Sequence, residues 1–313
     1  MLGAKTGLKK DYRTRMEAEI KHYQHIFKHS LFQEVPPVWN DVERKFSQKI
    51  RRVTGVAGLP EYIARHVRGR KKIKLLSLGS GACGVELDMI SPLLKKQKTE
   101  MELVSMDINA AVLARAELEA QKRKIVFRGV TQDINKLSLK PNSYDVIMVF
   151  AALHHFENIG RVAKQINSAL KPKGIFVTVD IPSRNGYKLW DEAKVLIDLI
   201  WKVLPARYKW DHTVSKVPIY MTQFPDVDYS IGSFEATNSE AILPSLRRYL
   251  KELVFVPAHG ITRRFFDTKF GPNYNMKKHF DKALFELITD VDDKLVDAGV
   301  LKPETFFGVY SKK

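Results

Sequence analysis

The chain has 313 residues, of which 44% are hydrophobic and 28% are charged. This composition is that of a globular protein, and it excludes wholesale disorder and a fibrous repeat. At about 100–200 residues per domain, the length fits one large domain or two modest ones. The single cysteine, Cys83, excludes an internal disulfide and fits a reducing compartment.

The apolar stretches of the sequence are too short for a membrane span, which needs about 20 residues. Residues 146–153 form one of the longest of them. The first ten residues lack the apolar region of a secretory signal peptide. We therefore expect a cytoplasmic protein without a membrane span.

The net charge of +17 is unevenly spread along the chain. Residues 1–72 hold 17 Lys and Arg against 7 Asp and Glu, so +10 of the charge lies in the first quarter. A basic face attracts nucleic acid, anionic lipid and anionic small molecules through the same field. A well-solvated surface explains the excess better than any one of these partners, so the charge selects none of them.

The first 70 residues predict three helices, over residues 11–32, 38–52 and 59–67. From Lys72 onward, short apolar runs alternate with helical patterns. The predicted strands are residues 73–78, 101–106, 125–129, 144–150 and 174–180, and the predicted helices between them are residues 85–94, 110–121 and 159–170. This alternation predicts βαβ units in a doubly wound, mostly parallel sheet of an α/β protein.

Beyond residue 181 the alternation breaks. The predicted elements are a helix over residues 187–204, a helix over 238–249 with Asn238 as its cap, a strand over 253–257, a helix over 277–298 and a strand over 306–310. Residues 205–235 read as a long irregular segment with several prolines and aromatic residues. Such a segment inside a compact domain is more often functional than inert.

A glycine-rich loop follows the first predicted strand. Gly79, Gly81 and Gly84 lie between this strand and the next helix. Glycine lets the backbone approach a ligand, and the helix N-terminus offers free N–H groups to a polar or anionic group. Asp107, at the end of the next strand, can accept hydrogen bonds from two ribose hydroxyls. The same glycine spacing occurs in nicotinamide enzymes, so an NAD-dependent oxidoreductase stays open at this point.

Later motifs distinguish the two classes. In chain order the motifs are Leu78-Gly79-Ser80-Gly81, Asp107, Asp133-Ile134, Tyr144-Asp145-Val146-Ile147, Leu153-His154-His155 and Leu170-Lys171-Pro172-Lys173-Gly174. Together they resemble the class I S-adenosylmethionine-dependent methyltransferases. The chain departs from the family pattern twice, with Lys173 in place of a glycine before the fifth strand and Cys83 in place of the third loop glycine.

The resemblance extends outside the core. Residues 51–55, 204–208, 239–244 and 265–273 look like a bacterial subgroup associated with glycan or secondary-metabolite modification. The resemblance implies a seven-stranded, Rossmann-like sheet, S-adenosylmethionine as the cofactor, and methyl transfer to a small-molecule or sugar acceptor, with oxygen favoured. Residues 1–70 would be a helical lid and residues 71–313 the methyltransferase core. Residues 181–235 would be a second lid that binds the acceptor.

The family resemblance also indicates which residues hold the cofactor. The expected residues are Gly79, Ser80, Gly81, Asp107, Ile108, Asp133, Ile134 and Phe150. Asp107 would accept the ribose hydroxyls, and Asp133 would accept the exocyclic amine of adenine. Each aspartate has a structural alternative, Asp107 as a helix cap and Asp133 as a solvated loop residue.

His154 and His155 follow the fourth strand, where the family places its reacting groups. Methyl transfer is a displacement at a sulfonium, and a hydroxyl acceptor must also lose a proton, which a neutral imidazole can take. Adjacent residues on extended backbone point in opposite directions, so we expect one base, His155 before His154.

Aromatic residues around the irregular segment are too many for a solvated loop. They are Tyr187, Trp190, Trp210, Tyr220 and Phe224. We expect several to line the acceptor pocket, Tyr187 and Trp190 first. The alternative is a small satellite core beneath the loop.

Other candidate sites have less support. His22, His25 and His29 share one helix face, but no carboxylate or cysteine cluster accompanies them, so we predict no metal site. Cys83 lies in the glycine loop and is not expected to be an attacking thiolate. The Asn-Pro-Pro-Tyr segment of enzymes that methylate base amines is missing after the fourth strand. An RNA-directed protein that uses the basic N-terminus stays an alternative and is not favoured.

Overall fold

The computed structural model describes residues 11–29, 34–56, 58–96 and 100–313, with side chains left undescribed at 27–29 and 93–96. The first ten residues of the expected N-terminal lid therefore lie outside the described residues. So does the side chain of His29, the third histidine of the expected helix face.

A seven-stranded sheet with the order β3-β2-β1-β4-β5-β9-β8 forms the centre of the molecule. Its strands are β1 (Lys72–Leu78), β2 (Glu100–Asp107), β3 (Val126–Thr131), β4 (Tyr144–Phe150), β5 (Leu170–Asp180), β8 (Leu250–Ala258) and β9 (Thr305–Lys312). Strand β9 is antiparallel to both of its neighbours, and the other pairs are parallel. The strand order reverses between β1 and β4, because β2 and β3 follow β1 on one side and β4 and β5 lie on the other. Open α/β sheets bind ligands at such a switch point. The predicted doubly wound, mostly parallel seven-stranded sheet is confirmed.

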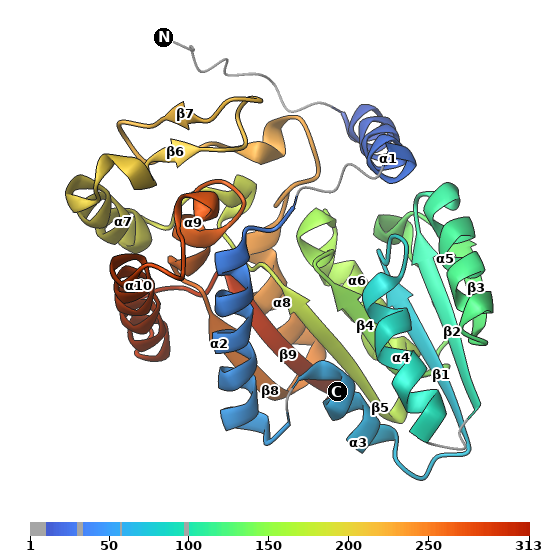
Figure 1. Ribbon diagram of the computed structural model, residues 1–313. Helices are drawn as coiled ribbons and strands as arrows, with labels where there is room; N and C mark the ends of the chain where they lie inside the picture. The colour runs from blue at the N-terminus through green and yellow to red at the C-terminus, as the bar shows by residue number, and fades with distance from the viewer. Residues whose placement is uncertain (1–10, 30–33, 57, 97–99) are drawn as a thin grey trace.

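Helices cover both faces of this sheet (Figure 1). They are α1 (Tyr12–His29), α2 (Pro37–Thr54), α3 (Leu59–Val67), α4 (Gly84–Lys96), α5 (Ala110–Lys122), α6 (Ile159–Ala169), α7 (Asp191–Val203), α8 (Ile242–Tyr249), α9 (Thr262–Phe266) and α10 (His279–Asp297). Within the described ranges, none of them combines the length and the apolar character that a bilayer crossing requires.

The two faces of the sheet have separate apolar layers. Helices α2 to α5 pack on the face that contains Leu75, and α6 and α8 pack on the face that contains Leu76. Neighbouring residues of a strand point to opposite faces, and both faces are covered here. This explains why β1 reads as a continuous apolar run.

A third apolar cluster includes Tyr208, Met221 and Phe224 of the irregular segment. It joins the start of α2 to α7, α9 and α10. The ring of Trp201 meets Phe224 at 5.2 Å and Phe270 at 5.0 Å between centroids. The segment also contains a small antiparallel pair, β6 (Trp210–Asp211) and β7 (Ile219–Tyr220), above this cluster (Figure 1).

Two predicted helices begin later than the sequence pattern indicated. Helix α7 starts at Asp191, because Tyr187 has a left-handed φ of 59° and Lys188 and Trp190 have extended backbone. Helix α8 follows a 3-10 turn at Ser239–Ala241. The expected cap by Asn238 is wrong, because its side chain instead donates a hydrogen bond of 2.8 Å to the Glu157 carbonyl.

Helix α1 is set apart from α2 and α3. It lies across the end of the sheet at which the parallel strands finish (Figure 1). Helices α2 and α3 instead pack into the layer on one face of the sheet. Of the described residues in the range 1–70, those of α1 are therefore the ones that approach the ligand-binding end of the sheet.

Candidate functional site

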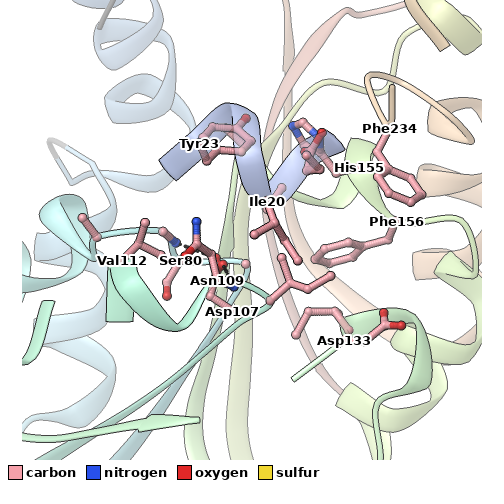
Figure 2. A pocket seen from close by; sticks show the side chains of 18 of the residues that line it. Ile20, Tyr23, Ser80, Asp107, Asn109, Val112, Asp133, His155, Phe156 and Phe234 are labelled. Atoms are coloured by element: carbon pink, nitrogen blue, oxygen red, sulfur yellow. Dashed lines mark hydrogen bonds and ion pairs between the residues drawn. The ribbon is translucent and has the colours of Figure 1, made fainter. Parts of the chain in front are cut away.

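A cavity of about 480 Å³ opens at the carboxyl ends of β1, β2 and β4. Its walls come from the glycine loop, the ends of these strands, α1 and Phe234. Figure 2 shows Ile20 of α1 pointing into the cavity, with Asp107 on one side and Phe156 on the other. The cavity thus lies where strand order predicts a ligand.

The glycine loop forms one wall because its backbone conformation needs glycine. Gly79 and Gly81 have φ values of 65° and 52°. A Cβ at Gly79 would lie 2.9 Å from the Ala152 Cβ, so a side chain there would push the loop away from the turn after β4. Cys83 is also left-handed, with φ of 55°, and is fully buried. Burial raises the pKa of its thiol to about 12, so the sulfur stays protonated at neutral pH.

Asp107 projects from the end of β2 into the cavity. Its Oδ2 accepts a hydrogen bond of 2.9 Å from the Gly81 N–H, and its Oδ1 accepts one of 2.9 Å from the Asn109 N–H. Each carboxylate oxygen can accept a further bond. Asn109, not Asp107, caps α5 by accepting from the Ala111 N–H at 3.1 Å. The carboxylate is therefore fixed in place and still able to bind a pair of hydroxyls.

Asp133 carries an unsatisfied polar atom at the cavity wall. Its Oδ1 accepts hydrogen bonds from the Tyr12 hydroxyl at 2.8 Å and the Asn135 N–H at 3.0 Å. Its Oδ2 is buried and accepts no hydrogen bond from any described residue. The nearest cation, Lys136 Nζ, is 3.7 Å away, too far for a hydrogen bond. Leaving such an atom unpaired costs about 1–3 kcal/mol, so Oδ2 is suited to a donor on a ligand.

Helix α1 is attached to the rest of the site by Arg15. This buried side chain forms an ion pair with Glu157 and a hydrogen bond of 3.2 Å with Thr237 Oγ1. Its guanidinium also stacks on the ring of Phe234, 4.5 Å from the centroid. These contacts hold α1 over the cavity.

Sequence reasoning missed the cavity residues of α1, which are Tyr12, Glu19, Ile20 and Tyr23. Their spacing places them on one helix face. That spacing marks an amphipathic helix, but it does not reveal whether the face covers a core or a ligand.

His154 lies behind the cavity wall and is buried. Its Nδ1 is 2.7 Å from Asp180 Oδ1. Asp180 Oδ2 also accepts the N–H groups of Ala152 at 2.9 Å and Leu153 at 2.8 Å, which fixes the turn after β4. Burial opposes ionisation of Asp180, but His154 and the backbone donors hold the pKa of this carboxyl below its usual value.

His155 lines the cavity and faces two carboxylates. Its Nδ1 is 3.1 Å from Glu19 Oε1 of α1, and its Nε2 is 3.7 Å from Glu235 Oε1. Burial alone would lower the pKa of this imidazole, but Glu19 and Glu235 together raise it above its usual value. Burial likewise would raise the pKa of Glu235, and the two histidines bring it below its ordinary value.

The two histidine rings do not point in opposite directions, which corrects the expectation from extended backbone. Residues 153–155 form a 3-10 turn. The ring centroids of His154 and His155 are therefore 4.3 Å apart, with the planes tilted by 41°. Both rings belong to one cluster, although only His155 lines the cavity.

The expected cofactor residues and His155 can be divided into those that line the cavity and those that do not. Those that line the cavity are Gly79, Ser80, Gly81, Asp107, Ile108, Asp133, Ile134 and His155. Phe150 does not, because its side chain packs against the apolar layer of α2 to α5, and Ala151 and Ala152 line the wall in its place.

The aromatic residues of the second expected lid do not line this cavity, so that expectation is corrected. Trp190 belongs to the third apolar cluster, with Lys302 Nζ 4.0 Å from its ring centroid, and Phe224 is in the same cluster. Trp210 and Tyr220 pair with each other at 5.5 Å. Tyr187 contacts the ring of His154 at 5.8 Å and forms a hydrogen bond with Glu235. The satellite core explains most of these residues.

Residues 78–178, which run from the end of β1 into β5, match the family described as "Methyltransferase domain". This part of the chain therefore matches a methyltransferase domain. The glycine loop, Asp107, Asp133 and the histidine turn all fall within the matched residues.

Two curated proteins are similar to parts of this chain. The biotin biosynthesis bifunctional protein BioHC of Saccharophagus degradans is 25% identical over 162 residues, which are 49% of this chain and 27% of that protein. The sterol 4-C-methyltransferase strm-1 of Caenorhabditis elegans is 23% identical over 133 residues, 40% of this chain and 36% of that protein. The matches thus span between about a quarter and a third of these relatives.

Among solved structures, a putative sarcosine dimethylglycine methyltransferase from Galdieria sulphuraria is similar to this chain. It is 14% identical, covers 81% of this chain and 83% of that chain, and gives a TM-score of 0.46.

Proposed function

We propose that this protein transfers a methyl group from S-adenosylmethionine to a small-molecule acceptor, preferably at an oxygen atom. The observation that carries the proposal is the buried, unsatisfied Oδ2 of Asp133 in a cavity that His155 also lines. An adenine amine would supply the missing donor at one end. The acceptor would then approach at the other end.

The residues around the cavity fit this cofactor. Asp107 has free acceptor capacity for two ribose hydroxyls. Ile108 and Ile134 supply apolar surface for an adenine ring. The glycine loop lets the backbone come close to the rest of the molecule. When bound, the cofactor would supply an activated methyl group on its sulfonium.

The acceptor would be enclosed by a lid. We propose that this lid consists of α1 and the segment around Phe234, since both border the cavity. Helices α2 and α3 pack on the sheet and belong to the core. The Arg15 contacts to Glu157 and Thr237 would hold the lid closed during transfer and exclude water.

His155 would act on the acceptor. In its neutral form its imidazole can take the proton of a hydroxyl, and Glu19 and Glu235 would then stabilise the charged ring. His154 is held by Asp180 behind the wall and would position this turn.

Calorimetric titration and methyl transfer test the proposed function. We expect the purified protein to bind S-adenosylhomocysteine and not NAD. We expect label from methyl-labelled S-adenosylmethionine to enter hydroxyl acceptors, sugars among them, before amines or carbon acids. Binding of NAD without S-adenosylhomocysteine would overturn the cofactor assignment, and label only on carbon or nitrogen would overturn the preference for oxygen.

A further inference from the structure

Two imidazoles and one carboxylate converge beside the cavity. His154, His155 and Glu235 each place one ligand atom within 4.8 Å of the others. The Nε2 atoms of the two histidines are 3.9 and 3.7 Å from the two carboxylate oxygens of Glu235. An N–H···O hydrogen bond is about 2.7–3.2 Å long, so these are not direct hydrogen bonds. Two ligand atoms bound to one metal ion at 2.0–2.2 Å are about 3–4 Å apart, which matches the observed spacing.

A second carboxylate lies behind each ring. Nδ1 of His154 is 2.7 Å from Asp180, and Nδ1 of His155 is 3.1 Å from Glu19. Histidines that ligate metals usually donate their other ring N–H to a carboxylate, which leaves the lone pair on Nε2. His154 makes such a hydrogen bond to Asp180, whereas the contact of His155 with Glu19 is an ion-pair contact without hydrogen-bond geometry. Both rings therefore present Nε2 to the same third carboxylate, Glu235. Tyr187 forms a hydrogen bond with Glu235 and so restricts its position.

The charge of the cluster also favours a cation. With both histidines neutral, Glu19, Asp180 and Glu235 place three negative charges in a region where the side chains of Asp180 and Glu19 are only 0% and 15% exposed. Buried charges need compensation, and a divalent ion would balance two of them. His22 and Arg263 are the further cationic groups that act on Glu235 and Tyr187.

We propose that His154, His155 and Glu235 bind a divalent transition-metal ion next to the methyl-transfer site. Nitrogen donors with one carboxylate suit Zn²⁺, Mn²⁺, Fe²⁺ or Co²⁺ better than Mg²⁺ or Ca²⁺. Three protein ligands leave coordination positions open, as in catalytic metal sites, and His155 borders the cavity in which the acceptor would lie. The site is thus built to bind an oxygen or nitrogen atom of a small molecule.

This metal site goes beyond the proposed function, which needs no ion. It also differs from the helix face of His22, His25 and His29, the histidines for which the sequence predicted no metal site. The three ligands come from two places about 80 positions apart in the sequence, so no short spacing reveals them. His155 cannot hold an ion and take a proton at once, and its role as a base belongs to the ion-free enzyme.

Metal titration of the full chain tests the proposal directly. The protein is treated with a chelator, dialysed, and titrated with Co²⁺ while the visible absorption is recorded, and then with Zn²⁺ by calorimetry. We expect one ion per chain and Co²⁺ bands that are intense and typical of low coordination number. His154→Ala and Glu235→Gln should weaken binding at least about 10-fold, and Glu19→Gln about 10-fold to 100-fold through the orientation of His155.

The matched control is His279→Ala, which removes an exposed histidine at the start of α10 and should bind metal like the unmodified chain. S-adenosylhomocysteine binding and circular dichroism establish that each variant is folded. Absence of stoichiometric binding, or binding that His154→Ala and Glu235→Gln leave unchanged, would overturn the metal site. Because S-adenosylhomocysteine binding is measured without metal, that result would leave the proposed function standing.

Discussion

The hydroxyl of Tyr12 donates a hydrogen bond of 2.8 Å to Asp133 Oδ1, which joins α1 to the turn after β3 across 121 positions of the sequence. The Asn135 side-chain amide donates to the same hydroxyl at 3.0 Å. The carboxylate proposed to bind adenine is therefore also a contact for the proposed lid. In the proposed function, cofactor binding and closure of α1 would therefore depend on one another.

Tyr12→Phe should weaken S-adenosylhomocysteine binding modestly. The substitution keeps the ring on Phe234 and removes the two hydrogen bonds of the hydroxyl, each worth about 1 kcal/mol or about 5-fold in affinity. Calorimetry measures the change, and stopped-flow fluorescence should show faster dissociation. Tyr220→Phe, on the exposed β6–β7 pair, is the control and should behave like the unmodified chain. Equal affinities for all three proteins would mean that α1 does not contribute to the bound state.

Asp107→Ala should weaken cofactor binding more strongly. It removes the acceptor for the ribose hydroxyls, a loss of about 1–3 kcal/mol. The fold should survive, because the side chain bonds only to loop N–H groups in the described structure. Asp88→Ala, an exposed residue of α4, serves as the control. Unchanged affinity for S-adenosylhomocysteine would remove Asp107 from the cofactor site.

Replacement of His155 should mainly lower turnover, and replacement of His154 should mainly lower stability. His155→Ala should lower turnover on a hydroxyl acceptor by about 100-fold to 10,000-fold, the usual range for general base catalysis, with cofactor affinity nearly constant. His154→Ala removes the side-chain partner of the buried Asp180 and should lower the melting temperature more than His155→Ala does. Full turnover by His155→Ala on a hydroxyl acceptor would withdraw its assignment as a base.

His259 should make stability depend on pH. It is buried between Phe46 and Trp39, and burial, followed by the charges of Arg263 and Lys49, lowers its pKa to about 3. The unfolded chain binds a proton below about pH 6.5 and the folded chain does not, so the free energy of unfolding falls as the pH drops through 6.5.

Urea unfolding at several pH values measures this effect. Between pH 6.5 and pH 5, the unmodified chain should lose about 1.5 kcal/mol more than His259→Asn, which keeps a residue that tolerates the positive φ at this position. If the free energy of unfolding has the same pH dependence in both proteins, His259 is protonated in the folded state and the prediction is contradicted.

The core could be predicted from the sequence because its signals are local. Residues 144–150 form a strand with the predicted bounds, since an apolar run between turns has few other solutions. Asp107 and Asp133 were found because they follow strands in a recognisable order. The cluster of His155, Glu19 and Glu235 could not be found in this way, because it forms only when α1 and the segment after β7 come together over the sheet.

Errors of the sequence interpretation have equally specific causes. Trp190 was assigned to an acceptor pocket because aromatic residues suit both ligand sites and apolar cores, and the third cluster decided between them. Phe150 was assigned to the cofactor because it ends β4, but its side chain faces the apolar layer. The sequence alone does not show which elements pack against Trp190 or Phe150, so it does not distinguish a ligand site from an apolar core at either residue.

The most direct test of the account compares S-adenosylhomocysteine with S-inosylhomocysteine by calorimetric titration. The second compound has a carbonyl where adenine has its amine, so it would present an acceptor to the unsatisfied Oδ2 of Asp133. We predict that it binds at least about 100-fold more weakly, from the lost bond and the unpaired carboxylate, and that Asp133→Asn reduces this difference. Equal affinities of the two compounds for the unmodified chain would contradict the placement of the adenine at Asp133, and with it the proposed cofactor site.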